Sequence, residues 1–241
     1  MQSDSLVIIP TYNEMENIQL ILDSIFKLKY PFHVLVVDDN SPDGTAGLVK
    51  EYMKKYPKSL HLLERKEKLG LGTAYIEGFR WALSREYEYI FEMDADFSHD
   101  PEDLPRLLKA CKEEDADMAI GSRYVTGVNV VNWPMSRVLL SWIASKYVRF
   151  ITRMKIHDTT AGFVCYKRKV LETIKLDKVK FVGYAFQIEM KFKTYDKGFE
   201  IVEVPVIFTD RTRGESKMSQ KIISEAIFGV IKLKVKSLFS K

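Results

Sequence analysis

The chain has 241 residues, of which 46% are hydrophobic and 29% are charged, a balance typical of a globular protein with a substantial core. Its formal net charge of +4 is mild, so bulk electrostatics give no reason to expect a nucleic-acid partner. Only two cysteines occur, Cys111 and Cys165, and no Cys/His cluster has zinc-ligand spacing, so we expect two reduced, buried thiols. We also expect no signal peptide, because Met-Gln-Ser-Asp-Ser leads directly into a short strand, and no membrane-spanning helix, because no apolar run is long enough.

Apolar runs bounded by turn residues predict that strands alternate with helices over the first half of the chain. Strands are expected at residues 6–9, 33–37, 60–63, 87–93 and 118–120. Helices are expected at residues 13–26, 45–56 and 70–84, and from Pro101 onward. This alternation is typical of an α/β fold with a doubly wound, mostly parallel sheet. The second half is less regular, with helices expected at 134–152 and 184–197 and strands at 162–166 and 201–208.

The last segment, residues 219–241, carries apolar residues at helical spacing beside a row of lysines. A basic amphipathic helix at a terminus can lie in a membrane interface. Taken alone, however, the segment favours a helix packed on the domain with a solvated lysine face. The alternation at residues 232–236 is also compatible with a short strand. We therefore divide the chain into a domain at 1–218 and a terminal basic helix at 219–241.

The most informative segment is Met93-Asp94-Ala95-Asp96, where an apolar strand runs directly into two aspartates separated by one residue. Open α/β sheets bind ligands at the carboxyl ends of their strands. Two carboxylates at that edge attract Mg²⁺ or Mn²⁺, and such a cation attracts a diphosphate. We therefore expect Asp94 and Asp96 to be metal ligands in a site for a nucleotide-activated substrate. An isolated pair of this kind is more often part of an exposed turn.

Two further loops follow strands at the same predicted edge. In Pro10-Thr-Tyr-Asn-Glu14, the Tyr12 ring suits a nucleobase and Glu14 offers acceptors for ribose or base N–H groups. The acidic acceptors of the loop at 38–45 suit a nucleoside better than a phosphate, which needs donors. Without a ligand, both loops would be ordinary strand-to-helix turns with capping residues.

Cationic residues are expected on the other side of this site. Arg123 follows the strand at 118–120, and a guanidinium there matches phosphate oxygens, although a single arginine is more often a surface residue. The segment 210–217, with Arg211 and Lys217, is polar and cationic and suits a loop that closes over a diphosphate. Carboxylates would thus hold a metal and a nucleoside, while cations would hold phosphates.

Five motifs occur in order along the chain: Pro10-Thr-Tyr-Asn-Glu14, Val37-Asp-Asp-Asn-Ser-Pro-Asp-Gly-Thr45, Met93-Asp-Ala-Asp96, Gly121-Ser-Arg-Tyr124 and Gly183-Tyr-x-Phe-Gln-x-Glu189. They resemble the family-2 glycosyltransferases of the GT-A fold, and specifically the dolichol- or polyprenol-phosphate mannosyltransferases. The resemblance covers about residues 6–218. The motifs at 10–14 and 93–96 are common to the superfamily, whereas 38–45 and Arg211-x-x-Gly-Glu-Ser-Lys217 indicate the polyprenyl-phosphate branch.

The resemblance implies a Rossmann-like GT-A domain and inverting, Mg²⁺- or Mn²⁺-dependent transfer of mannose from GDP-mannose to a polyprenyl or dolichyl phosphate. It implies that the guanosine part is held by Pro10, Tyr12, Glu14, Val37 and Asp39. It implies that the sugar diphosphate lies at Asp94, Ala95 and Asp96, with Asp96 on the metal. Phosphates would be bound by Arg123, Arg211 and Lys217, and the catalytic residues would be Asp96, Arg211 and Lys217. Arg137 and Ser141 resemble an acceptor-phosphate pair.

Two departures from the family pattern matter. Some members place a glutamine two residues after the second aspartate as a further metal ligand, whereas this chain has Ser98. Many members also carry C-terminal transmembrane helices, so this chain resembles the short type, peripheral on the cytoplasmic membrane face and docked on lipid or on a membrane-protein partner. With a lipid acceptor, membrane contact by residues 219–241 becomes the favoured interpretation.

Two alternatives stay open. The first is a UDP-glucose-dependent transferase acting on a polyprenyl phosphate or on a saccharide, which would need a carboxylate base near the reacting carbon. The second is a non-catalytic subunit that binds a nucleotide sugar and regulates a membrane partner.

Overall fold

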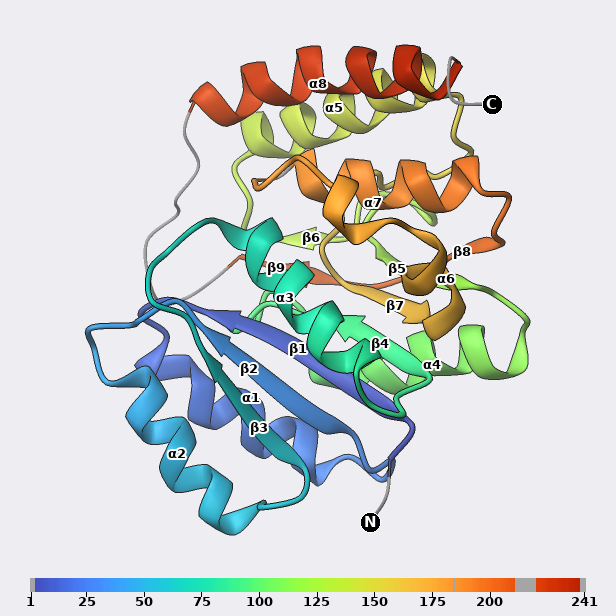
Figure 1. The fold of residues 1–241 in the computed structure, drawn as a ribbon. Helices are drawn as coiled ribbons and strands as arrows, with labels where there is room; N and C mark the ends of the chain where they lie inside the picture. The colour runs from blue at the N-terminus through green and yellow to red at the C-terminus, as the bar shows by residue number, and fades with distance from the viewer. Residues whose placement is uncertain (1–2, 184, 211–219, 239–241) are drawn as a thin grey trace.

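The computed structural model describes residues 3–183, 185–210 and 220–238 (Figure 1). Its centre is a seven-stranded sheet in the order β3-β2-β1-β4-β7-β5-β8. The strands are β1 (Ser5–Thr11), β2 (His33–Asp38), β3 (Leu60–Glu64), β4 (Tyr89–Glu92), β5 (Met118–Ser122), β7 (Val164–Lys167) and β8 (Ile201–Pro205). Neighbouring strands are parallel, except that β7 runs antiparallel to both β4 and β5.

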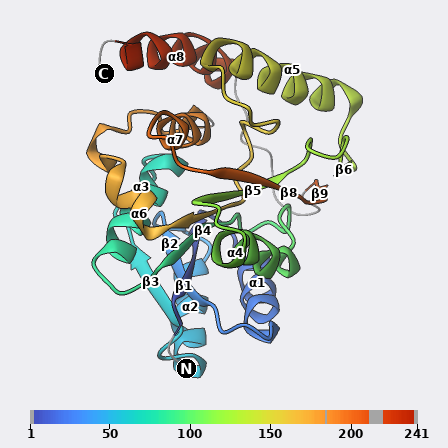
Figure 2. The ribbon, with the colours of Figure 1, turned by 90° about the vertical axis from the view of Figure 1, so that its right-hand side faces the viewer.

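Helices cover both faces of this sheet. One face is covered by α1 (Met15–Lys27), α2 (Thr45–Lys55) and α4 (Leu104–Glu113), the last preceded by a 3₁₀ turn (Pro101–Asp103). The other face is covered by α3 (Leu71–Leu83), α6 (Arg168–Thr173) and α7 (Ala185–Asp196). Beyond α7, the long helices α5 (Met135–Thr152) and α8 (Gln220–Leu238) form an outer layer at one end of the molecule (Figures 1 and 2).

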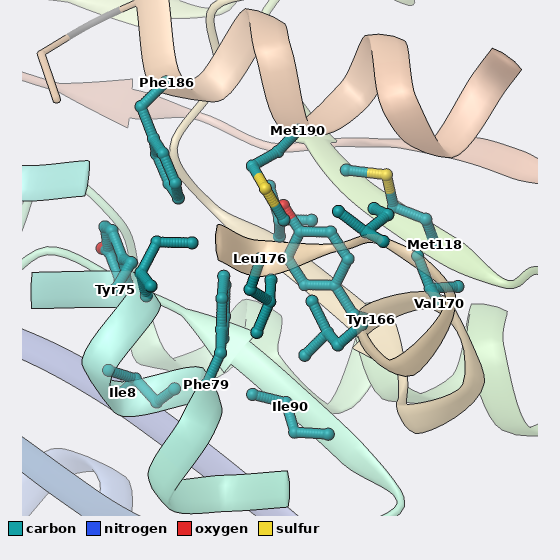
Figure 3. Packing of buried hydrophobic residues seen from close by; sticks show 14 of the residues in the cluster. Ile8, Tyr75, Phe79, Ile90, Met118, Tyr166, Val170, Leu176, Phe186 and Met190 are labelled. Carbon is teal, nitrogen blue, oxygen red and sulfur yellow. The ribbon is translucent and has the colours of Figure 1, made fainter. Parts of the chain in front are cut away.

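The central strands are apolar on both faces because helices cover both faces. Side chains alternate across β1, so Ile8 packs under α3 and α7 while its neighbour Ile9 packs under α1 and α4. Figure 3 shows the first of these layers, in which Phe186 from α7 lies against Tyr75 from α3. At Gly78 the backbone of α3 approaches β1 so closely that a Cβ would lie 2.7 Å from Ile8 Cγ2.

The α/β fold and the mostly parallel sheet predicted from the sequence are confirmed. The strand predicted at 201–208 is wrong in extent, because β5 ends at Ser122 and pairing then moves to another partner. Residues 208–209 form β9 (Phe208–Thr209), which pairs in parallel with β6 (Val130–Val131) in a second small sheet. The segment 232–236 lies within helix α8, so the short-strand alternative is also wrong. Cys111 and Cys165 are both free and buried, as expected.

Candidate active site

The predicted loops meet at the carboxyl edge of the sheet. Pro10 pairs with Val37 and Thr11 with Asp38 in the parallel register of β1 and β2, so the loops that follow these strands adjoin each other. The Thr11 hydroxyl donates to Asp38 Oδ1 over 2.8 Å, and the Asp39 N–H donates to the Thr11 carbonyl over 3.0 Å. Strand β4 flanks β1 on its other side, which brings residues 94–96 to the same edge.

The loop at 38–45 holds the loop at 12–15 in place. Asp43 Oδ2 accepts a hydrogen bond from the Met15 N–H over 3.0 Å, which satisfies a donor at the start of α1. The Thr45 hydroxyl accepts from the Glu14 N–H over 3.1 Å, and the Ser41 hydroxyl accepts from the Asn13 N–H over 3.0 Å. Much of this acidic motif therefore has a structural task, namely fixing the backbone that carries Tyr12 and Glu14.

Asp39 is buried beside Arg65, an arginine that sequence reasoning did not single out. Arg65 Nη1 lies 2.9 Å from Asp39 Oδ1, and Arg65 Nη2 donates to the Thr73 hydroxyl over 2.6 Å. Burial raises the pKa of Asp39, and the Arg65 guanidinium counteracts part of that rise. Nearby, the Lys68 ammonium lies 4.0 Å from the centroid of the Tyr12 ring. The predicted nucleoside end of the site thus contains two cations as well as the predicted acids.

The Asp94–Asp96 segment turns sharply at the end of β4. Asp94 is partly exposed, whereas Ala95 and Asp96 are buried, and Phe97 takes a left-handed backbone conformation with φ +60°. Asp96 Oδ1 accepts from the Ser98 N–H over 3.0 Å, and the Tyr75 hydroxyl donates to Asp94 Oδ1 over 3.4 Å. The two carboxylates therefore project from one short turn, and the hydrogen bond between Asp96 and Ser98 holds its backbone.

The donor set fits a hard divalent cation. Carboxylate oxygens are ligands that Mg²⁺ and Mn²⁺ favour. Within the part of the chain that the structure describes, no group of three or more His, Cys, Asp or Glu side chains is placed to hold a metal. Asp94 and Asp96 would therefore supply only part of a coordination shell, as is usual for Mg²⁺, which takes its remaining oxygens from water and substrate phosphates.

The buried side chain of His99 holds the backbone of this turn through a hydrogen bond. The Asp94 N–H donates to His99 Nδ1 over 3.1 Å, which assigns the imidazole proton to Nε2. The ring stacks on Phe163 with 5.0 Å between centroids, and burial lowers the pKa of His99 to about 4. At neutral pH this histidine is an uncharged packing residue that fixes the backbone of Asp94.

Arg123 lies at the end of β5, at the predicted edge, but its guanidinium is engaged with a buried carboxylate. Arg123 Nε and Nη2 donate to the two carboxylate oxygens of Asp158 over 2.7 and 2.6 Å, and Nη2 also donates to the Thr160 hydroxyl over 2.8 Å. Burial alone would raise the pKa of Asp158, but the charge and hydrogen bonds of Arg123 outweigh it and lower that pKa. A role for Arg123 in phosphate binding stays a prediction.

Arg137 and Ser141 lie one turn apart near the start of α5. Arg137 Nη1 donates to Asp210 Oδ1 over 2.8 Å, and its guanidinium lies 4.0 Å from the Trp133 ring. Asp210 directly precedes the segment that contains Arg211 and Lys217, which both lie outside the described residues. The structure thus joins Arg137 of the predicted acceptor pair to the residue where the predicted cationic loop begins.

A buried polar cluster beneath the aspartates was not foreseen from the sequence. Glu92 accepts from Gln187 Nε2 over 2.6 Å and from the Tyr166 hydroxyl over 3.2 Å, and burial raises its pKa to about 7. The ammonium group of Lys191 donates to the Ala161 carbonyl over 2.5 Å, and burial lowers its pKa to about 8. The Gln187 hydrogen bond ties α7 to Glu92, the last residue of β4, which is two positions before Asp94.

The architecture is shared with known enzymes. A mannosyltransferase from Pyrobaculum calidifontis, solved with GDP-Man and Mn²⁺, has a TM-score of 0.61 at 20% identity, with 100% of this chain and 75% of that chain covered. Glucosyl-3-phosphoglycerate synthase from Mycobacterium tuberculosis, solved with Mn²⁺, UDP and phosphoglyceric acid, has a TM-score of 0.66 at 16% identity, with 97% and 78% covered. At these identities the likeness concerns the fold, which is that of the GT-A glycosyltransferases.

The family follows from the sequence. Residues 6–175 match the family described as glycosyl transferase family 2, and the chain belongs to it. It is 50% identical to a polyprenol monophosphomannose synthase of Mycolicibacterium smegmatis, over 94% of this chain and 85% of that protein. It is 48% identical to an undecaprenyl-phosphate mannosyltransferase of Micrococcus luteus, over 93% of this chain and 91% of that protein.

Proposed function

We propose that this chain transfers mannose from GDP-mannose to a polyprenyl phosphate, inverts the anomeric carbon and releases GDP. The observation that carries the proposal is the half-identity, over nearly the whole chain, to two proteins named for mannose transfer to such a lipid phosphate. The charge pattern supports it, because Asp39, Asp94 and Asp96 lie at the predicted nucleoside and metal positions. Arg65 accompanies Asp39 there, and Arg123 follows β5.

The donor would occupy the carboxyl edge of the sheet. Its guanosine part would lie against Tyr12, Glu14 and Asp39, with Pro10 and Val37 beneath it. Its diphosphate would lie at residues 94–96, where Asp96 and Asp94 would hold Mg²⁺ or Mn²⁺. The bound cation supplies positive charge that stabilises the departing diphosphate.

The acceptor would need no protein base. A phosphate monoester is largely ionised at neutral pH, because its second pKa is about 6. Its oxygen can therefore attack the anomeric carbon directly, and the protein's task is to orient it and to stabilise the charge that develops. Arg123, Arg137 and Ser141 would bind phosphates, together with Arg211 and Lys217 from the segment outside the described residues. The acceptor phosphate would compete with Asp210 for Arg137.

The outer layer would dock on the cytoplasmic face of a membrane, with residues 1–218 as the catalytic domain and 219–241 as part of the docking surface. Helices α5 and α8 lie together at one end of the molecule (Figure 2). Large apolar side chains are exposed along α5, at Met135, Leu139, Leu140, Trp142, Ile143 and Phe150. Such a surface is typical of a peripheral membrane contact or a membrane-protein partner. Within the described residues, no helix is long and apolar enough to cross a membrane.

A panel of donors and acceptors tests the proposal. GDP-mannose and UDP-glucose are each incubated with a short polyprenyl phosphate or with a free saccharide, and labelled products are separated. We expect label only in polyprenyl phosphate given GDP-mannose. Transfer from UDP-glucose or to the saccharide would favour the first alternative. Donor binding with no transfer to either acceptor would favour a regulatory subunit.

A further inference from the structure

A groove lies between α7, α8 and the segment 173–181 that precedes α7. It is an open groove of about 920 Å³, within the upper part of the size range of small-molecule sites. Among the residues that the structure describes, no predicted donor or acceptor residue lines this groove.

The groove is strongly basic. Seven lysines line it, against two carboxylates, Glu189 and Asp196. Glu189 is already engaged, because its Oε2 accepts from the Lys180 N–H over 2.8 Å and its Oε1 lies 3.0 Å from Lys193 Nζ. Burial lowers the pKa of Lys193, Glu189 opposes this, and the nearby ammonium groups of Lys236 and Lys178 lower it further. The lysines therefore repel one another, and an anion in the groove would relieve that repulsion.

The groove is also apolar at its base. Phe181, Phe192 and Leu233 line it between the lysines. Helix α8 closes one side by packing on Phe181, whose ring lies so near Gly229 that a Cβ there would be 2.5 Å from Phe181 Cζ. A ligand that fits must therefore combine a negative group with a hydrocarbon part.

The rim of the groove belongs to the surface proposed for membrane docking. On α8, the exposed side chains of Phe228, Ile231 and Val235 alternate with Lys232 and Lys236, which line the groove. A membrane that meets these apolar side chains would place its headgroups beside the lysines.

We propose that this groove binds an anionic phospholipid, with its phosphodiester among the lysines and the start of an acyl chain on Phe181, Phe192 and Leu233. The proposal rests on the membrane docking included in the proposed function. It adds a selectivity for lipid charge that neither the donor site nor the apolar face of α5 would supply. Charge complementarity and the apolar base favour this occupant over a soluble anion, which would leave the base uncovered.

The test compares two matched double variants. Lys178→Gln with Lys232→Gln removes one lysine of the groove from the segment before α7 and one from α8. Lys27→Gln with Lys58→Gln removes two exposed lysines at the α1 and α2 end of the molecule (Figure 1). Binding is measured to vesicles of phosphatidylcholine alone and to vesicles with about a third phosphatidylglycerol. Thermal unfolding is also measured with soluble short-chain phosphatidylglycerol or phosphatidylcholine, since a ligand of the folded state raises Tm.

The native protein and the control variant should prefer the anionic vesicles, and short-chain phosphatidylglycerol should raise their Tm. The groove variant should lose at least about tenfold of the anionic preference, because each lysine near an anionic surface contributes about fivefold. It should also lose the Tm shift while keeping its binding to neutral vesicles. An equal anionic preference in both variants, or none in the native protein, would overturn the proposal. Inorganic phosphate that raised Tm as well as the lipid does would assign the groove to a soluble anion.

Mannosyl transfer in detergent, with a short-chain acceptor, separates this inference from the proposed function. The groove variant should retain transfer, because Lys178 and Lys232 lie outside the proposed catalytic residues. If transfer is absent from all forms while anionic selectivity is present, the proposed function fails and the lipid site stands. If transfer is present but no form prefers anionic vesicles, the lipid site fails and the proposed function stands.

Discussion

Asp39 and Arg65 form a buried ion pair at the proposed nucleoside end of the site, with 2.9 Å between Oδ1 and Nη1. Their side chains are only 8% and 3% exposed, and they follow the ends of the neighbouring strands β2 and β3. Burial disfavours the charged carboxylate and raises the pKa of Asp39, and the Arg65 guanidinium opposes that rise, as the proposed role of Asp39 as a nucleoside acceptor requires.

Replacing this arginine should therefore change the pH dependence of donor binding. Burial raises the pKa of Asp39, so affinity that needs the carboxylate is lost as pH falls through that raised value. In Arg65→Met the pKa of Asp39 should rise further, so GDP affinity should decline from a higher pH than in the native protein. Calorimetric titration with GDP from neutral to mildly acidic pH measures this.

The matched control for that variant is Arg80→Met, which alters a half-exposed arginine paired with Asp177 on the surface. It should leave both GDP affinity and its pH profile unchanged, since exposed ion pairs contribute little. Identical profiles for the two variants would argue against a role for Arg65 at the nucleoside.

The second prediction concerns Asp96→Asn. The amide keeps an oxygen for the hydrogen bond from the Ser98 N–H, so the turn and Tm should be preserved, while the charge on the proposed cation ligand is removed. We expect kcat/KM with Mn²⁺ to fall at least about 100-fold, the scale of losing one preorganised charge stabiliser. Steady-state kinetics over a range of Mn²⁺ concentrations measure the effect.

Asp100→Asn is the control four residues away. Asp100 is exposed and caps the 3₁₀ turn at Pro101–Asp103, and asparagine caps equally well. Its activity should match that of the native protein. If Asp96→Asn turned over at the native rate, Asp96 would not be a metal ligand.

Most of the sheet and its functional edge could be predicted from local sequence. The apolar run that enters Asp94 and the turn residues after each strand are short-range signals, and parallel strands carry their following loops to one edge. The reversed direction of β7 could not be read in this way. Residues 164–166 are apolar like the parallel strands, and the direction of β7 depends on the long excursion of the chain through α5.

The site residues that the sequence did not predict are brought to the site by tertiary contacts rather than by local sequence patterns. Arg65 belongs to no recognisable sequence motif. In the register of β2 and β3, however, Asp38 pairs with Glu64, and this pairing places Arg65 beside Asp39. The Gly183–Glu189 motif was known only through the resemblance. Its Gln187 donates to buried Glu92 on β4, a contact across residues far apart in sequence. Only a packed structure shows that this motif supports the turn carrying Asp94.

Glycine substitutions on two helices should have opposite effects on stability. In Gly78→Ala the new Cβ would meet Ile8 Cγ2 at 2.7 Å inside the core, and overpacking of this kind costs about 1–3 kcal/mol. In Gly47→Ala, within α2, the added Cβ would meet no neighbouring atom within 4 Å, so the higher helix propensity of alanine should stabilise the folded protein by about 0.5–1 kcal/mol. Urea unfolding gives both free energies. A Gly78→Ala protein as stable as the native protein, or more stable, would contradict the packing of α3 on β1.

The apolar face of α5 should contribute to membrane binding. Ile143 is 55% exposed there, and Ile143→Gln should weaken binding to phosphatidylcholine vesicles at least about fivefold, because part of an isoleucine side chain leaves the hydrocarbon. Leu20→Gln, at a 45% exposed position on α1 at the other end of the molecule, is the matched control. Co-sedimentation measures both. Equal vesicle binding by the two variants would show that α5 is not part of the docking surface.

The central claim is mannose transfer at a metal-bearing acidic edge. It is tested most directly by incubating the native protein with labelled GDP-mannose, a defined short polyprenyl phosphate and Mn²⁺, then repeating the reaction with chelator and with Mn²⁺ restored. We predict labelled polyprenyl-phosphate mannose and stoichiometric GDP, loss of both with chelator, and recovery on adding metal. Intact donor, or GDP release with no label in the lipid, would contradict the account.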